Sequence, residues 1–375
     1  MNAAFIHSDE LQRYHYPDTC PFKTERAAMT REKLRRVGQY DGDGRREVTP
    51  EAAGEEELRR FHTAEYLDVL KRISAGTIGP EDLFFGVGTD DTPVFFGLYE
   101  YARLAAGASL TGARLLCDGD VRVAFNPSGG FHHARPAEAG GFCYINDIVL
   151  ACMHLRERGK RVCCLDLDAH HGNGTQDAFY RTRDVLTVSF HESGKTIYPW
   201  GGFEQEIGED EGKGYNVNLP LPRGTDDETY TRAFHALVPP LLDWYTPDVL
   251  VVEIGMDVLG GDPLVHLNMT NNVFADILPG LIARNIPLLF TGGGGYHPEN
   301  TARGWARVWT ILCGLENEND EWIGLGGTFL GTSEWSAGFR DMRTYARGPE
   351  QETIRKEVAQ SVETVKQLIF AQHGL

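Results

Sequence analysis

The sequence predicts a single α/β domain over residues 1–375, in which a central parallel sheet of about eight strands carries helices on both faces. Two observations support this prediction. From about residue 100, short and almost wholly apolar runs alternate with longer stretches of helical periodicity, which is typical of parallel strands buried on both sides. The 375 residues are enough for one large domain, and no shift in composition marks a linker.

The expected helices follow from apolar spacing and from their end signals. Gly159, for example, ends the helix before it, and a four-glycine loop at 292–295 precedes another. Helices are expected over 62–72, 99–117, 143–158, 226–245, 271–283, from the glycine loop to 313, and over about 351–372.

The expected strands are the apolar runs between these helices. They cover 121–125, 161–167, 185–190, 215–219, 249–254 and 287–290. Residues 43–49 are expected to form a polar loop and 315–350 an irregular segment, while the rest of the first 90 residues shows no clear pattern.

Charge and cysteine content restrict the environment and the partners. The net charge of −18 disfavours a nucleic-acid partner and attracts a cationic substrate, such as a lysine-rich peptide or a polyamine. Seven cysteines without a C-x-x-C pair indicate a reducing compartment. No signal peptide and no apolar run of about 18 residues is recognisable. We therefore expect a soluble cytoplasmic protein without a membrane partner; its oligomeric state is not indicated.

Polar clusters follow four of the expected strands, each at the point where the strand ends. They cover 128–133, 166–171, 255–257 and 292–296. Because the carboxyl ends of parallel strands meet at one edge of a sheet, these loops are expected to converge on one site.

The cluster DLDAHH at 166–171 indicates a metal site. Asp168 and His170 are two residues apart, so on a strand both side chains would point to the same side. With Asp257 they supply three ligands to one divalent metal, which leaves an open position as in catalytic zinc sites. Two carboxylates and one imidazole also suit ferrous iron.

The remaining polar residues suit proton transfer and oxyanion binding. His132 and His133 are candidates for general acid and base, and Asp166 and Asn173 can orient their rings. Tyr296 follows the glycines and can donate its phenol proton to an oxyanion. Taken singly, each feature has a structural explanation: a polar loop, a helix cap or a tight turn. Their joint occurrence at strand ends favours a catalytic site over these separate structural explanations.

These residues resemble the motifs of the histone deacetylase family, which has the arginase/deacetylase fold. The resemblance runs from about residue 16 to 315 and is strongest with bacterial members of the acetoin-utilisation type. The motifs, within a catalytic region at 91–305, are PSGGFHH at 127–133, GFCYIND at 141–147, DLDAHHGNG at 166–174, GGDPL at 260–264 and GGGGY at 292–296.

The resemblance implies a zinc-dependent hydrolase that removes acetyl or other short acyl groups from lysine side chains of proteins, and that binds hydroxamate inhibitors. Zinc would be held by Asp168, His170 and Asp257. The catalytic residues would be His132, His133, Tyr296, Asp166 and Asn173. Substrate would be bound by Asp91 at the rim and by Gly141, Phe142, Tyr198 and Leu264. Arg26 would lie near the pocket for the acid product, and a structural potassium ion would be held by Asp166, Asp168, His170 and Ser189.

Three positions depart from the family pattern. Asn173 stands where class I enzymes carry aspartate, and so resembles class II; a neutral partner should leave the histidine pair less basic. Tyr198 stands where a phenylalanine usually faces Phe142, which adds a hydroxyl group to the tunnel. Leu264 stands where class I enzymes carry methionine.

Three alternatives were weighed against this function. The arginase branch needs two further carboxylates, at positions where this chain has Gly172 and Leu259. Acylpolyamine amidohydrolases share the catalytic residues but carry a long insertion, for which residues 82–91 are too short. A non-catalytic acyl-lysine binder would be expected to have lost a metal ligand or the tyrosine, and this chain has lost neither.

Overall fold

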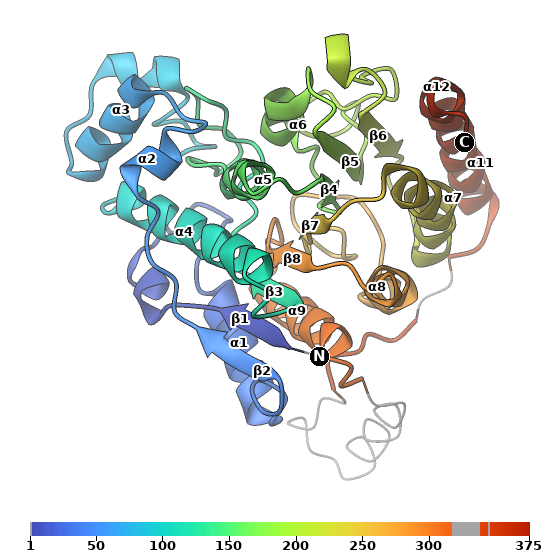
Figure 1. The fold of residues 1–375 in the computed structure, drawn as a ribbon, viewed down its shortest axis with the longest axis horizontal. Coiled ribbons are helices and arrows are strands. Elements are labelled where there is room, and N and C mark those ends of the chain that lie inside the picture. Colours follow the sequence, from blue (N-terminus) through green and yellow to red (C-terminus); the bar gives the residue numbers. More distant parts are fainter. Residues whose placement is uncertain (1, 317–337, 344–345) are drawn as a thin grey trace.

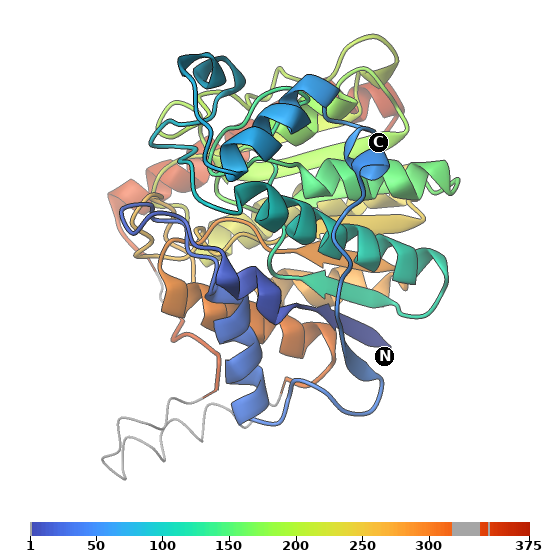
Figure 2. The same cartoon turned by 90° about the vertical axis from the view of Figure 1, so that its left-hand side faces the viewer.

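The computed structural model describes residues 2–316, 338–343 and 346–375. In these residues the chain forms one eight-stranded parallel sheet in the order β2-β1-β3-β8-β7-β4-β5-β6, with helices on both faces (Figures 1 and 2). The predicted fold class is confirmed. The strands are β1 (Ala3–Ile6), β2 (Arg45–Val48), β3 (Val123–Asn126), β4 (Val162–Asp166), β5 (Val185–Glu192), β6 (Asn216–Leu221), β7 (Val249–Glu253) and β8 (Leu288–Thr291).

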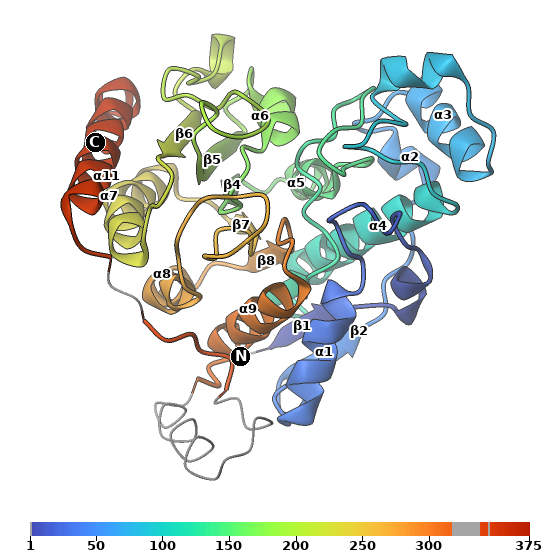
Figure 3. The ribbon, with the colours of Figure 1, turned by 180° about the vertical axis from the view of Figure 1, so that it is seen from behind.

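The described helices cover the two faces of the sheet (Figures 1 and 3). They are α1 (Arg26–Arg36), α2 (Glu55–Leu58), α3 (Ala64–Ser74), α4 (Leu98–Cys117), α5 (Asp147–Glu157), α6 (Asn173–Phe179), α7 (Asp227–Tyr245), α8 (Asn272–Ala283), α9 (Pro298–Leu312), α11 (Pro349–Val365) and α12 (Ala371–His373). None of the helices in these described ranges has the length and apolar character that a membrane crossing needs.

Alternating strand residues build a separate apolar layer on each face. On β4, for example, Cys163 and Leu165 pack with α7, α8 and α9, while Val162 and Cys164 pack with α4 and α5. All of these strand residues are buried. The near-continuous apolar runs of the sequence thus correspond to a sheet that is covered twice.

The N-terminal region is where the sequence prediction was wrong. Residues 45–48 form the edge strand β2 instead of a polar loop, and β1 lies between β2 and β3. The polar sequence of β2 is explained by its position at the edge, where Glu47 pairs with Arg31 of α1. The short apolar run of β1 lacked the alternation with helices that revealed the later strands.

The expected helix over 143–158 begins later, as α5 at Asp147. The Asn146 side chain accepts a hydrogen bond from the Val149 amide at 3.0 Å and caps the helix. Phe142, before it, has a left-handed φ of 64°, so the preceding motif forms a loop. Other predicted elements agree with the structure to within about three residues. Most of the expected irregular segment 315–350 lies outside the described residues.

Strand register lines up a row of polar residues at the carboxyl edge of the sheet. Asn126 pairs with Thr291, Thr291 with Glu253, Glu253 with Asp166, and Asp166 with Ser189. All five are buried. The loops that leave this row carry the candidate site.

Candidate active site

Four loops bring the sequence-predicted residues together above the polar row. His132 and His133 follow β3, Asp168 and His170 follow β4, Asp257 follows β7, and Tyr296 follows β8. Asp168 and His170 lie in the loop after β4, which ends at Asp166, so the alternation of side chains along a strand does not orient them. They are oriented by a tight turn instead: the Asp168 amide donates to Asp166 Oδ1 at 3.0 Å, and the His170 amide donates to Asp168 Oδ1 at 2.8 Å.

Asp168, His170 and Asp257 form a buried group of metal-ligand type. One donor atom of each lies within 4.8 Å of the others, and His170 Nδ1 is 2.9 Å from Asp257 Oδ2 and 3.3 Å from Asp168 Oδ1. Burial, and then the charge of Asp168, raise the pKa of Asp257 to about 7. Burial lowers the pKa of His170, but its contacts with both carboxylates outweigh this effect and raise it to about 10. A divalent cation would offset the negative charge of the two facing carboxylates. The two carboxylates and the imidazole therefore fit a metal ion.

Two glycines make room for this group. A Cβ atom added at Gly255 would lie 2.1 Å from Asp168 Oδ2, and one at Gly294 would lie 2.0 Å from Asp257 Oδ2. The Gly294 amide also donates to Asp168 Oδ2 at 2.5 Å. Close approach of the backbone to the two carboxylates therefore accounts for glycine at these positions.

His133 lies in a neutral environment. Asn173 Oδ1 also accepts from the Gly174 amide at 3.0 Å, so its contact with His133 Nδ1 at 2.8 Å places the ring proton on Nδ1. Burial lowers the pKa of His133 well below its ordinary value, and the neighbouring His132 and His170 rings lower it further. His133 Nε2 therefore keeps its lone pair.

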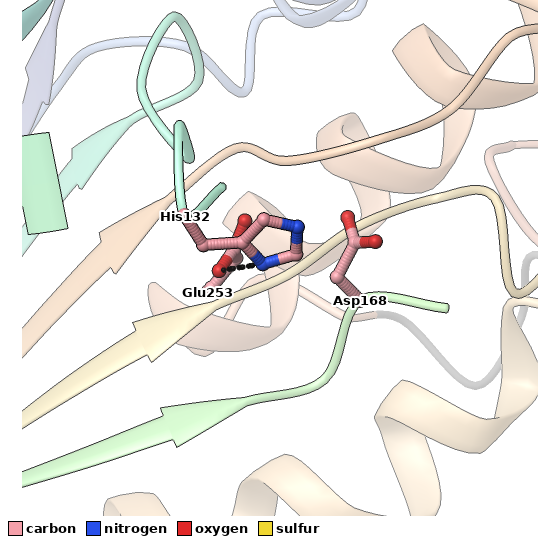
Figure 4. A group of neighbouring side chains, drawn as sticks. All are labelled: His132, Asp168 and Glu253. Atoms are coloured by element: carbon pink, nitrogen blue, oxygen red, sulfur yellow. Dashed lines mark ion pairs between the residues drawn. The ribbon is translucent and has the colours of Figure 1, made fainter. Parts of the chain in front are cut away.

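His132 lies in the opposite environment. Its Nδ1 is 3.2 Å from Asp166 Oδ2 and 2.8 Å from Glu253 Oε2, and Figure 4 shows Glu253 and Asp168 on either side of the ring. Burial lowers the pKa of His132, but the two carboxyl groups outweigh it and raise the pKa well above the ordinary value. His132 Nε2 lies 3.1 Å from His133 Nε2, so the two rings face each other through these nitrogens.

Aromatic rings stand around the mouth of the site. The Phe142 ring centroid is 5.7 Å from that of Tyr296, and the Tyr198 centroid is 4.9 Å from that of His133. Tyr296 also approaches His170, at 6.0 Å between ring centroids. Burial, and then the nearby carboxylates, raise the pKa of the Tyr296 phenol well above its ordinary value, so it remains a proton donor.

Residues around the site hold its loops. The Asp91 backbone carbonyl accepts from the Phe142 amide, and Asp91 Oδ2 accepts from the Gly141 amide, each at 2.8 Å. Buried Arg26 donates to the carbonyls of Gly293 and Gly295, at 3.1 and 2.9 Å. Both anchors therefore act on loops that carry predicted site residues.

Two other predicted residues occupy different environments. The Ser189 hydroxyl donates to Asp166 Oδ2 at 3.2 Å and is buried. Leu264 is 37% exposed, which suits a rim position more than a core one.

Sequence reasoning missed two residues of this region. Glu253 is the only charged residue in the apolar run 249–254, and that anomaly was the available signal. Asp262 accepts from the Tyr296 amide at 2.8 Å and from the Leu264 amide at 2.9 Å. It lies within the GGDPL motif, but the sequence did not indicate that it would anchor the tyrosine.

Comparisons with known proteins agree with this geometry. A sequence model described as the histone deacetylase domain matches residues 20–312. Histone deacetylase RPD3 of Saccharomyces cerevisiae is 39% identical over 317 residues, which cover 84% of this chain and 71% of that protein. Acetoin utilization protein AcuC of Bacillus subtilis is 36% identical over 334 residues, which cover 86% of each. A crystal structure of an HDAC homolog complexed with SAHA has a TM-score of 0.84 and 31% identity, and covers 98% of this chain and 100% of that one.

Proposed function

The chain belongs to the histone deacetylase family, and on that premise we propose that it is a lysine deacetylase, a hydrolase that cleaves the amide bond of acetyl-lysine or other short acyl-lysine side chains in proteins. The observation that carries the proposal is the convergence of a metal-ligand group, a histidine pair and a tyrosine at one sheet edge. The matched family and relatives favour this activity over acylpolyamine hydrolysis.

Asp168, His170 and Asp257 are the proposed metal ligands. Their two carboxylates and one imidazole fit zinc, and ferrous iron is the proposed alternative in the cell. When bound, the metal polarises the amide carbonyl and lowers the pKa of water. The protein contributes the burial of the group and the glycine backbone that surrounds it.

His133 is the proposed general base. Its Nδ1 proton is held by Asn173, so Nε2 takes a proton from the attacking water and later delivers a proton to the leaving lysine amine. His132, oriented by Asp166, provides positive charge beside it. Tyr296 donates a hydrogen bond from its phenol to the oxyanion that forms on the carbonyl oxygen when water attacks the carbonyl carbon. The products are a free lysine amine and a short carboxylate.

The remaining site residues are proposed to bind substrate and product. Phe142 and Tyr198 would line the tunnel around the lysine stem, which is supported by their contacts with Tyr296 and His133. Asp91 would hold the substrate backbone at the rim, Gly141 and Leu264 would also bind substrate, and Arg26 would lie near the acid product. A potassium site at Asp166, Asp168, His170 and Ser189 belongs to the same proposal, as does a reducing, cytoplasmic location, which the free state of all seven cysteines supports.

Hydrolysis of a substrate panel tests this function. The panel contains acetyl-, longer acyl- and trifluoroacetyl-lysine peptides beside N-acetylputrescine and N-acetylspermidine, each with and without a hydroxamate such as SAHA. Hydroxamate-sensitive cleavage of the lysine peptides is expected. Cleavage of the polyamines alone would contradict the proposed substrate class, and no cleavage by the metal-loaded protein would contradict the enzyme itself.

A further inference from the structure

Glu253 ends β7 at the centre of the polar row and has no part in the mechanism above. Its side chain is completely buried. Neither carboxyl oxygen accepts a hydrogen bond from any residue that the structure describes. Burying a carboxyl group without hydrogen bonds is costly, so this position needs a compensating interaction.

That interaction is with His132. Glu253 Oε2 lies 2.8 Å from His132 Nδ1, which is closer than Asp166 Oδ2 at 3.2 Å. The Asp166 carboxylate also accepts from the Ser189 hydroxyl and the Asp168 amide. Among the residues that the structure describes, His132 is the ion-pair partner of Glu253. Figure 4 shows its carboxyl group directed at the ring from β7.

The backbone leaves Glu253 little freedom to act elsewhere. Its carbonyl accepts from the Leu167 amide at 3.0 Å, and its register neighbours are Asp166 on one side and Thr291 on the other. Thr291 carries a buried hydroxyl that also lacks a hydrogen-bond partner among the described residues. The backbone of Glu253 is thus held within the sheet, and from this position its side chain contacts His132.

We propose that Glu253 is a positioning residue for His132. Asp166 accepts the Nδ1 proton of the ring, and Glu253, which contacts the same nitrogen, helps to hold the ring so that Nε2 faces His133 and the metal-ligand group. It touches no reacting atom and acts only through the imidazole. This inference rests on the role proposed for His132 in the deacetylase reaction.

A double-mutant cycle of Glu253→Gln and His132→Ala tests the inference. Glutamine keeps the size of the side chain and replaces its carboxyl group with an amide. In the unaltered background, E253Q is expected to lower kcat on an acetyl-lysine peptide about tenfold, with little change in KM. In the H132A background the same change is expected to have no further effect. Thr291→Val, which alters the adjacent buried position in the same row, serves as the matched control and should leave kcat unchanged.

Two outcomes of the cycle would overturn the inference. One is an equal loss from E253Q in both backgrounds, which would indicate a purely structural role. The other is wild-type kcat in E253Q. Metal analysis adds a third, because donor atoms of His132, Asp168 and Glu253 lie within 4.8 Å of one another. If the protein bound two metal ions per chain and E253Q lost one of them, Glu253 would be a metal ligand instead.

Nitrogen-15 spectra of labelled histidine separate this inference from the proposed function. If the unaltered protein cleaves no acyl-lysine peptide, the function fails, but the His132 ring can still be observed. A change in the His132 Nδ1 signal in E253Q, with the His133 signals retained, would support the positioning role. Unchanged His132 signals would refute it.

Discussion

The two adjacent histidines of the site lie in opposite surroundings. The inner group consists of His132 with Asp166 and Glu253, and all three side chains are buried. The outer group consists of His133 with Asn173 and Tyr198, where the partners are a neutral amide and an aromatic ring. The carboxyl groups raise the pKa of His132, whereas burial and neighbouring rings lower that of His133.

The difference shows how one residue type can perform two tasks. A general base must be unprotonated at working pH, whereas an electrostatic partner must be charged. The chain obtains both from consecutive residues because the loop after β3 turns one ring toward the carboxyl edge of β4 and β7 and the other toward α6. Asn173 is the first residue of α6.

The largest expected effect separates the two groups directly. His133→Ala removes the base and should lower kcat/KM by roughly 10²–10⁴-fold, and His132→Ala should cost less because Asn173 still orients the remaining base. Steady-state kinetics of both variants on one acetyl-lysine peptide measure the difference. Equal losses, or a larger loss in H132A, would remove the distinction between the groups.

Tyr296→Phe should lower the rate without changing the surroundings of either histidine. Its ring lies beside His170, at 6.0 Å between ring centroids, and loss of its hydrogen bond to the oxyanion is expected to lower kcat roughly 10²–10³-fold. The shape of the pH profile should not change, because neither histidine loses a partner. Near-full activity of this variant would refute the role assigned to the tyrosine.

Asn173→Asp should make the outer group resemble the inner one. A carboxylate at this position would stabilise the imidazolium form of His133 and raise its pKa. Because the base must be unprotonated, the low-pH limb of kcat/KM should then move to higher pH, by about one pH unit or more. A limb that stays in place or moves to lower pH would show that His133 does not set it.

Tyr198→Phe should have the smallest effect. The phenol lies beside His133 and forms no hydrogen bond among the described residues, so its removal should change kcat/KM by about two- to tenfold at most. Comparing acetyl- with longer acyl-lysine peptides would show whether the change depends on chain length. A loss of the size expected for H133A would instead place Tyr198 in the chemistry.

The sequence predicted the parts of the molecule whose pattern is local. Apolar runs such as 161–167 and 249–254 identified the central strands, and polar residues at their ends identified the site. Of the inner group, the sequence indicated His132 and Asp166 but not Glu253. The approach of Glu253 to His132 depends on the register between β7 and β4 and on the loop after β3. The edge strand β2 was missed for a similar reason, since its charged residues are explained by a partner on α1.

The charge states of the two histidines test the account most directly. Nitrogen-15 spectra of the zinc-loaded protein, with His132 and His133 assigned from single variants, can follow both rings from about pH 6 to 8. The account predicts that His132 stays doubly protonated over this range while His133 stays neutral with its proton on Nδ1. A charged His133 beside a neutral His132 would contradict it.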